Sequence, residues 1–241
     1  MNDSAAIPSP DGDRRAVVMS GPVEMAGPVE PGSPAAGLLT PRLRLTPVAD
    51  GDLEDLFALH ADPRAFAEDS TDPLSDRDQM RWVLTQWIEG WESHGRGYLS
   101  VRARASAQDR NTAQDRNAAH DQGSARARAG GSTLRASPAA PSGLLGVVGL
   151  AVLESAGQSL LSAYWRLDPA ATGRGVASEA MSAVLTDPRC GPRGREVVAV
   201  TAASNLPSRS LAARLGFHPA PAQRPVPGGR EGDVLLVRPA S

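Results

Sequence analysis

In AATGRGVASEAM, residues 170–181, two glycines flank an arginine directly before a helical pattern. Gly173 and Gly175 remove side chains at the point where the helix is expected to begin. Such a turn exposes backbone N–H groups at the positive end of a helix, which is one way in which proteins bind phosphate. A tight turn without a ligand explains the same residues, so the neighbouring elements must decide between the two.

The residues on either side of the turn predict a strand, a helix and a second strand. Apolar runs at 144–153 and 159–167 predict two buried strands joined as a hairpin. A helix is expected after Gly175 and ends before Pro188, and residues 196–201 (EVVAVT) predict the next strand. In a strand–helix–strand crossover the two strands run parallel.

The remaining periodic segments complete a mixed sheet with helices on both faces, an α/β (α+β) fold class. The further elements expected are a strand at 43–46, a helix capped by Asp50, a helix capped by Ser75 or Asp76, a strand at 97–102, a helix that begins at Pro207 and ends before Gly216, and a strand at 234–237.

Two segments carry no such periodicity. Residues 1–37 are expected to be a disordered tail, and residues 103–142, which repeat AQDRN, a disordered insertion. The rest of 38–241 then has the size of a single domain. The insertion has six arginines against three aspartates, so docking on RNA or a ribosome is an alternative to a solvated loop.

Composition excludes several classes of function. The formal charge of −2 over 241 residues gives no general attraction to nucleic acid or anionic membranes. The single cysteine, Cys190, excludes an internal disulfide, fits a cytoplasmic location and is expected to be an inert thiol. With one cysteine and four histidines, no metal site is expected. The apolar runs are too short to span a membrane.

Two nucleotide-binding motifs compete for the glycine turn. A P-loop ends in Gly-Lys-Ser/Thr, and this chain has no lysine. The dinucleotide fingerprint G-x-G-x-x-G/A has Ser178 in its last position here, and it needs an acidic residue after the next strand, where Asn205 stands. Neither motif is therefore favoured.

A second motif follows the crossover, at residues 205–217 (NLPSRSLAARLGF). A Gly-x-Gly turn that opens a helix, then a strand, then N-x-x-S and a helix ending in Leu-Gly-Phe, resembles the GNAT acyltransferases. Within them it resembles the RimJ/RimL-like branch, which acetylates the N-termini of ribosomal proteins. TPRLRLTPVADGDLEDLFAL resembles that branch's first strand and helix, and YWRLDPAATGRGVASEAM its cofactor motif.

The resemblance implies a mixed, mostly antiparallel central sheet flanked by helices, with one parallel crossover at the cofactor site. It also implies acetyl-CoA as co-substrate, with its pyrophosphate on the backbone N–H groups of the turn and its pantetheine arm paired along residues 164–167. The residues expected at the cofactor are Trp165, Arg166, Leu167, Thr172, Gly173, Arg174, Gly175, Val176, Ala177, Asn205 and Ser208.

The implied reaction is direct attack of a neutral amine on the thioester. Asn205 and Ser208 are the expected catalytic residues. Ser208, or a water that it holds, is the candidate proton donor to the departing thiolate, because Ala212 stands where many family members have a tyrosine. The carboxylates of Glu68, Asp69 and Glu154 are each expected to be solvated, so no general base is assigned.

The sequence thus predicts an N-acetyltransferase that acts as a monomer or homodimer on a protein N-terminal amine or a small-molecule amine. An α-amine, whose pKa is about 8, is partly neutral at pH 7 and can lose its proton to water, which favours such acceptors. A catalytically silent acyl-CoA-binding module is the alternative, because the tyrosine is absent and the base is unassigned.

Overall fold

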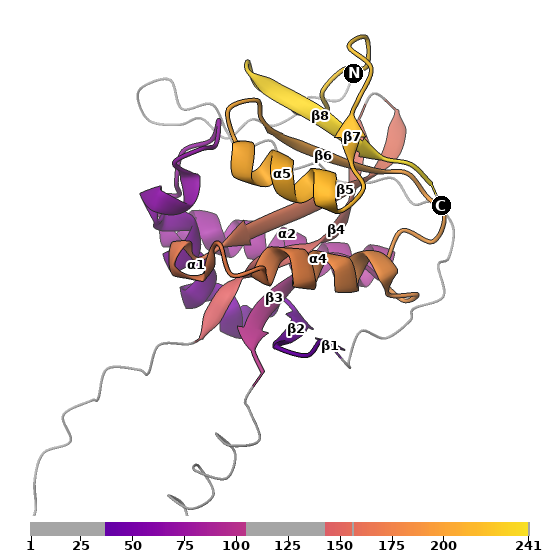
Figure 1. The fold of residues 1–241 in the computed structure, drawn as a ribbon. Coiled ribbons are helices and arrows are strands. Elements are labelled where there is room, and N and C mark those ends of the chain that lie inside the picture. Colours follow the sequence, from indigo (N-terminus) through magenta and orange to yellow (C-terminus); the bar gives the residue numbers. More distant parts are fainter. Residues whose placement is uncertain (1–36, 105–142, 156, 241) are drawn as a thin grey trace, which may run out of the picture.

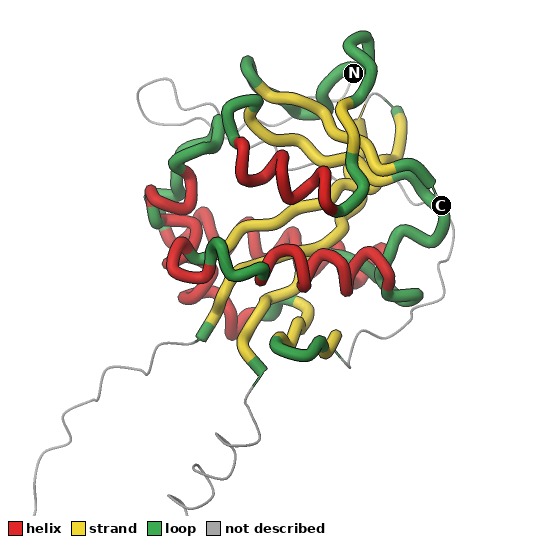
Figure 2. The backbone as a smooth tube through the Cα atoms, in the orientation of Figure 1, coloured by secondary structure: helices red, strands yellow, loops and turns green. Residues whose placement is uncertain are grey.

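A computed structural model describes residues 37–104, 143–155 and 157–240, arranged as in Figures 1 and 2. The expected tail lies outside the described residues except for Gly37. The expected insertion also lies outside the described residues, except for Ala103 and Arg104. Ala103 ends a strand, and the Arg104 N–H donates to the Arg42 carbonyl (2.8 Å).

The first part of the chain supplies the first three strands of the sheet and two α-helices. Its elements are β1 (Leu38–Leu39), β2 (Leu43–Pro47), the 3₁₀ turn η1 (Asp50–Asp52), α1 (Leu53–Ala61), the 3₁₀ turn η2 (Pro63–Phe66), α2 (Arg77–His94) and β3 (Tyr98–Ala103).

The second part contains the hairpin, the crossover and the last strands. Its elements are β4 (Leu144–Ser155), β5 (Gln158–Leu167), the 3₁₀ turn η3 (Pro169–Ala171), α4 (Val176–Thr186), β6 (Val197–Ala202), α5 (Leu206–Arg214), β7 (His218–Pro219) and β8 (Asp233–Arg238). The edge strands β1 and β7, of two residues each, were not predicted, because two residues are too few to show a periodic pattern.

The strands form one sheet in the order β1-β2-β3-β4-β5-β6-β8-β7. All neighbouring pairs are antiparallel except β5 and β6, which the α4 crossover makes parallel. The predicted fold class, a mostly antiparallel sheet with one parallel crossover, is confirmed.

Helices cover both faces of this sheet. In Figure 1, α4 and α5 lie in front of it, whereas α1 and α2 lie behind it. Val147 and Val148 are neighbours on β4, so their side chains point to opposite faces, yet both are 0% exposed. Because helices cover both faces of the sheet, the sequence of this strand is a nearly continuous apolar run.

Helix starts follow local hydrogen bonding. Asp76 caps α2 as predicted, since its carboxylate accepts a hydrogen bond from the Asp78 N–H (2.8 Å). Asp50 does not cap α1, because it begins the 3₁₀ turn that precedes the helix. Asp52 stabilises that turn instead, by accepting from the Ala49 N–H (3.0 Å).

The Cys190 thiol is buried. Burial, and after it the carboxylate of Asp187, raises the pKa of Cys190 to about 12, which agrees with an inert thiol. Among the described residues, no helix is both long and apolar enough to cross a membrane.

Two glycines, one in a crowded place on β4 and one in an open place on α2, allow a test of how closely the chain packs around each position. A Cβ on Gly149 of β4 would lie 2.2 Å from the Gly97 carbonyl oxygen, whereas a Cβ on Gly90 of α2 meets nothing within 4 Å. We expect Gly149→Ala to lower the free energy of unfolding by about 1–3 kcal/mol. Gly90→Ala is expected to raise it by roughly 0.5–1 kcal/mol. Urea denaturation measures both, and equal effects would contradict the prediction.

Candidate active site

The glycine turn has the backbone geometry that its sequence suggested. Gly173 and Gly175 have φ values of 71° and 73°, a region that favours glycine. Gly175 is the N-cap of α4 and offers no capping side chain, and the first α-helical hydrogen bond runs from the Glu179 N–H to the Gly175 carbonyl (3.0 Å). The N–H groups of the first turn, residues 176–178, therefore have no partner within the helix.

The side chains of the other predicted residues of the turn differ in exposure. Thr172 is exposed, and its hydroxyl donates to the Pro169 carbonyl (2.8 Å). The Val176 side chain is buried, whereas Arg174 is exposed. A Cβ on Gly173 would meet nothing within 4 Å, so the front of the turn is open. An anion can approach the N–H groups from there.

The strand that leads into the turn is only partly paired with its parallel neighbour. β5 pairs with β6 at Leu161 and Ser162 alone, although β5 continues to Leu167. Beyond Ser162 the strands separate, as Figure 2 shows. The β6-facing backbone groups of 163–167, which include Trp165, Arg166 and Leu167, are left without a strand partner among the described residues.

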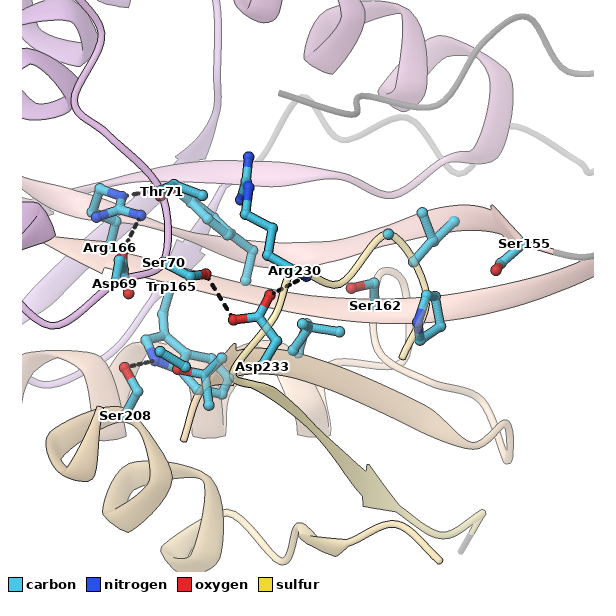
Figure 3. Close-up of a pocket in the computed structure, with 18 of the residues that line it drawn as sticks. Asp69, Ser70, Thr71, Ser155, Ser162, Trp165, Arg166, Ser208, Arg230 and Asp233 are labelled. Carbon is cyan, nitrogen blue, oxygen red and sulfur yellow. Dashed lines mark hydrogen bonds and ion pairs between the residues drawn. The ribbon is translucent and has the colours of Figure 1, made fainter. Parts of the chain in front are cut away.

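A pocket of about 490 Å³ lies at this opening (Figure 3). Its walls come from β5, the ends of β4 and β6, the first turn of α5, and two loops at 69–71 and 227–230. The loops are connected through Asp233, which accepts hydrogen bonds from the Ser70 hydroxyl (2.7 Å) and the Arg230 backbone N–H (2.9 Å). A volume of this size suits a small ligand or part of a larger one.

Asn205 and Ser208 lie together at the start of α5. The Asn205 side chain is 7% exposed, and its Oδ1 accepts a hydrogen bond from the Ser208 N–H (3.0 Å), which caps the helix. Ser208 lines the pocket, and its Oγ accepts from the Trp165 Nε1–H (3.3 Å). The hydroxyl proton of Ser208 is then available to donate into the pocket.

A chain of hydrogen bonds connects Asn205 to the opposite side of the sheet. Asn205 Nδ2 donates to Asp69 Oδ1 (2.9 Å), and Asp69 Oδ2 forms an ion pair with Arg166 Nη2 (2.6 Å). Arg166 Nε donates to the Tyr164 hydroxyl (2.9 Å), which lies 3.1 Å from His60 Nε2. These contacts join α1, β5, the loop after η2 and α5.

One expectation about a side chain changes with this network. Asp69 is not the solvated carboxylate that was expected, because a buried cation and a buried amide hold it; Glu68 and Glu154 are exposed, as expected. The Arg166 guanidinium lies 3.6 Å from the centre of the Phe66 ring and donates to Asp69, so only its backbone is available at the open edge of β5.

The family model described as acetyltransferase (GNAT) domain matches residues 42–218, which include both motifs. The chain belongs to the GNAT acetyltransferase family. It is an acetyl-CoA-dependent acetyltransferase of this family, so the family and enzyme class predicted from the sequence are confirmed.

Solved GNAT structures share the fold. A GnaT-family acetyltransferase from Bordetella pertussis is 25% identical, with a TM-score of 0.58 over 84% of this chain and 99% of that one. RimL, the ribosomal L7/L12 α-N-protein acetyltransferase solved with coenzyme A, is 16% identical, with a TM-score of 0.56 over 83% and 96%. The Salmonella typhimurium enzyme that modifies the N-terminal serine of L7/L12 is 14% identical, with a TM-score of 0.54 over 84% and 97%. No curated protein matched the chain.

His60 makes the stability of this GNAT enzyme depend on pH. Burial, and after it the charge of Arg166, lowers the pKa of His60 from 6.5 to about 4. Between these values the unfolded chain binds a proton that the folded chain does not, so the free energy of unfolding falls as the pH falls from 6.5 to 4. The full loss is on the order of 3 kcal/mol at 1.36 kcal/mol per pKa unit.

Urea denaturation at several pH values between 5 and 7 measures this effect. In His60→Gln the part of the pH dependence that His60 contributes should disappear, whatever the absolute stability of the variant. The same substitution at the exposed His218 is the control and should keep the wild-type slope. A wild-type slope in His60→Gln would contradict the assignment.

Proposed function

We propose that this enzyme transfers the acetyl group of acetyl-CoA to a primary amine, either a protein N-terminal α-amine or a small-molecule amine, in the cytoplasm. The observation that carries the proposal is the separation of β5 from β6 after Ser162. The opening leads from the glycine turn to Ser208 and the pocket, as a long thioester substrate requires.

The chain offers two kinds of contact to the coenzyme. The N–H groups of residues 173–177, at the positive end of α4, suit a pyrophosphate, and Arg174 adds a cation. The open edge of β5 offers backbone groups that can pair with the amides of pantetheine in the manner of an added strand. No described side chain lies within 4 Å of the Cβ position of Gly173, so the approach is not blocked.

Ser208 is the proton donor of the proposal. The amine nitrogen forms a bond to the acetyl carbon, the carbon–sulfur bond breaks, and the sulfur takes up the Ser208 proton. The amine loses its proton to water, and Ser208 regains a proton from water, so the protons balance. Because Trp165 donates to Ser208 Oγ, the Ser208 hydroxyl keeps its own proton for that sulfur. Asn205 keeps Ser208 in place by capping the same turn.

The residues that line the pocket are compatible with an amine acceptor but do not identify a particular amine. Asp69 is engaged by Arg166 and Asn205, which leaves Glu154 as an exposed carboxylate in the wall and water as the proton acceptor. The Salmonella enzyme is described as modifying an N-terminal serine, which supports an α-amine as the first acceptor to test.

Calorimetric titration with acetyl-CoA tests the role of the turn. Wild type is expected to bind, and the Gly173→Glu/Gly175→Glu variant to lose binding, because two carboxylates would block and repel the phosphates. Gly157→Glu is the matched control: it adds a carboxylate at the same φ of 73°, but at the opposite end of β5. Thermal melts show whether each variant folds. A wild type that does not bind acetyl-CoA would refute the proposal.

Acetyl transfer to a panel of amines tests Ser208. The panel contains a peptide with an N-terminal serine, a polyamine, an aminoglycoside and free amino acids. With whichever amine is acetylated, Ser208→Ala should lower kcat by about 100-fold, the usual contribution of a general acid, while binding of acetyl-CoA stays similar. Ser210→Ala, on the exposed side of the same helix, should leave kcat unchanged. An unchanged kcat in Ser208→Ala would exclude it as the donor.

A further inference from the structure

Arg42 lies beside the glycine turn although it precedes Arg174 by 132 positions. It belongs to the turn between β1 and β2, and a Cβ on Gly175 would lie 3.5 Å from its Nη2. Arg42 Nη1 donates to the Arg174 carbonyl (3.0 Å), and Nε donates to Glu179 Oε2 (2.6 Å). The Arg42 backbone N–H also donates to Glu179 Oε1 (3.0 Å), so the residue is held in one orientation.

The bond to the Arg174 carbonyl fixes one peptide group of the turn. In a trans peptide the carbonyl and the following N–H point in opposite directions, and no peptide among the described residues is cis. Because Arg42 draws the Arg174 carbonyl toward itself, the Gly175 N–H points away from Arg42. Arg42 thus determines the direction of an N–H group in the middle of the proposed pyrophosphate site.

The contact with Glu179 balances a charge that would oppose phosphate binding. Glu179 lies one turn into α4, and its side chain is 18% exposed. Burial acts to raise the pKa of Glu179, but hydrogen bonds from Thr40 and Arg42 outweigh it, so the pKa lies below its ordinary value and the carboxylate is charged at neutral pH. Without Arg42 this carboxylate would repel a phosphate at the start of the helix.

We propose that Arg42 is a positioning residue for the coenzyme, which orients the Arg174–Gly175 peptide and neutralises Glu179 so that the turn can accept the pyrophosphate. The inference rests on the proposed function, since it concerns the same site. It adds to the coenzyme site a residue from the turn between β1 and β2, at the edge of the sheet. It also assigns to the Glu179 carboxylate a charge that would weaken phosphate binding and that Arg42 neutralises.

Calorimetric titration with CoA tests the inference on the full chain. Arg42→Ala should weaken binding by about tenfold, the effect of one lost charge-assisted hydrogen bond, with kcat at saturating acetyl-CoA unchanged. Adding Glu179→Gln to Arg42→Ala should recover about threefold, because the unbalanced carboxylate is removed. Arg77→Ala, which breaks the surface ion pair with Glu54, is the matched control and should bind as wild type.

The outcomes separate this inference from the proposed function. If wild type does not bind CoA, the proposed function fails; if wild type and Arg42→Ala bind equally, only the role of Arg42 fails. Dephospho-CoA, which keeps the pyrophosphate but lacks the 3′-phosphate, should show the same loss in Arg42→Ala. A loss confined to CoA would overturn the positioning role in favour of a 3′-phosphate contact.

If Arg42→Ala has a lower melting temperature than wild type, two further variants still test the inference. Arg42→Gln keeps a donor for the Arg174 carbonyl and removes the charge, so it should bind CoA more tightly than Arg42→Ala and less tightly than wild type. Glu179→Gln alone should bind at least as tightly as wild type. Weaker binding in Glu179→Gln than in the double variant would overturn the charge-balancing role.

Discussion

The separation of β5 from β6 opens the middle of the sheet, and the surrounding elements are arranged about this opening. A strand in the middle of a sheet normally satisfies its backbone groups on both sides, and groups left unpaired away from water cost free energy. Here two residue pairs join the parallel strands, and the rest of β5 is open on one side. A sheet can keep such an opening when a bound molecule takes the place of the missing strand, and a linear substrate with amide groups meets that requirement.

The elements around the opening keep it from closing. β6 is paired along its whole length with β8, and β5 with β4, so each strand is held by its other neighbour. The hydrogen-bond chain from Asn205 through Asp69 and Arg166 holds the start of α5 at a fixed place relative to β5. Since this chain is largely buried and fully paired, it can be rigid without leaving an uncompensated charge.

Charge is distributed unevenly between the two ends of the opening. At the glycine turn, the helix has free N–H groups, Arg174 is exposed, and the carboxylate of Glu179 in the first turn of α4 is bonded to Arg42. At the pocket, carboxylates are present, but Asp69 and Asp233 are each held by hydrogen bonds from the chain. The turn therefore offers donors to an anion, whereas the charges of these two pocket carboxylates are already compensated within the chain.

The sequence by itself determined the local parts of this protein. Periodic apolar residues marked the long strands and helices, Pro188 and Gly216 marked helix ends, and the pair of glycines marked the turn, because each pattern depends on contacts within one element or its neighbour. The family resemblance rested on the same local motifs. Only the tertiary structure decided that Asp69 meets Arg166 and Asn205, that Arg42 meets Glu179, and how far β5 and β6 remain paired. The side-chain contacts join residues 97 to 137 positions apart, and they depend on how the helices and strands pack, which no local pattern encodes.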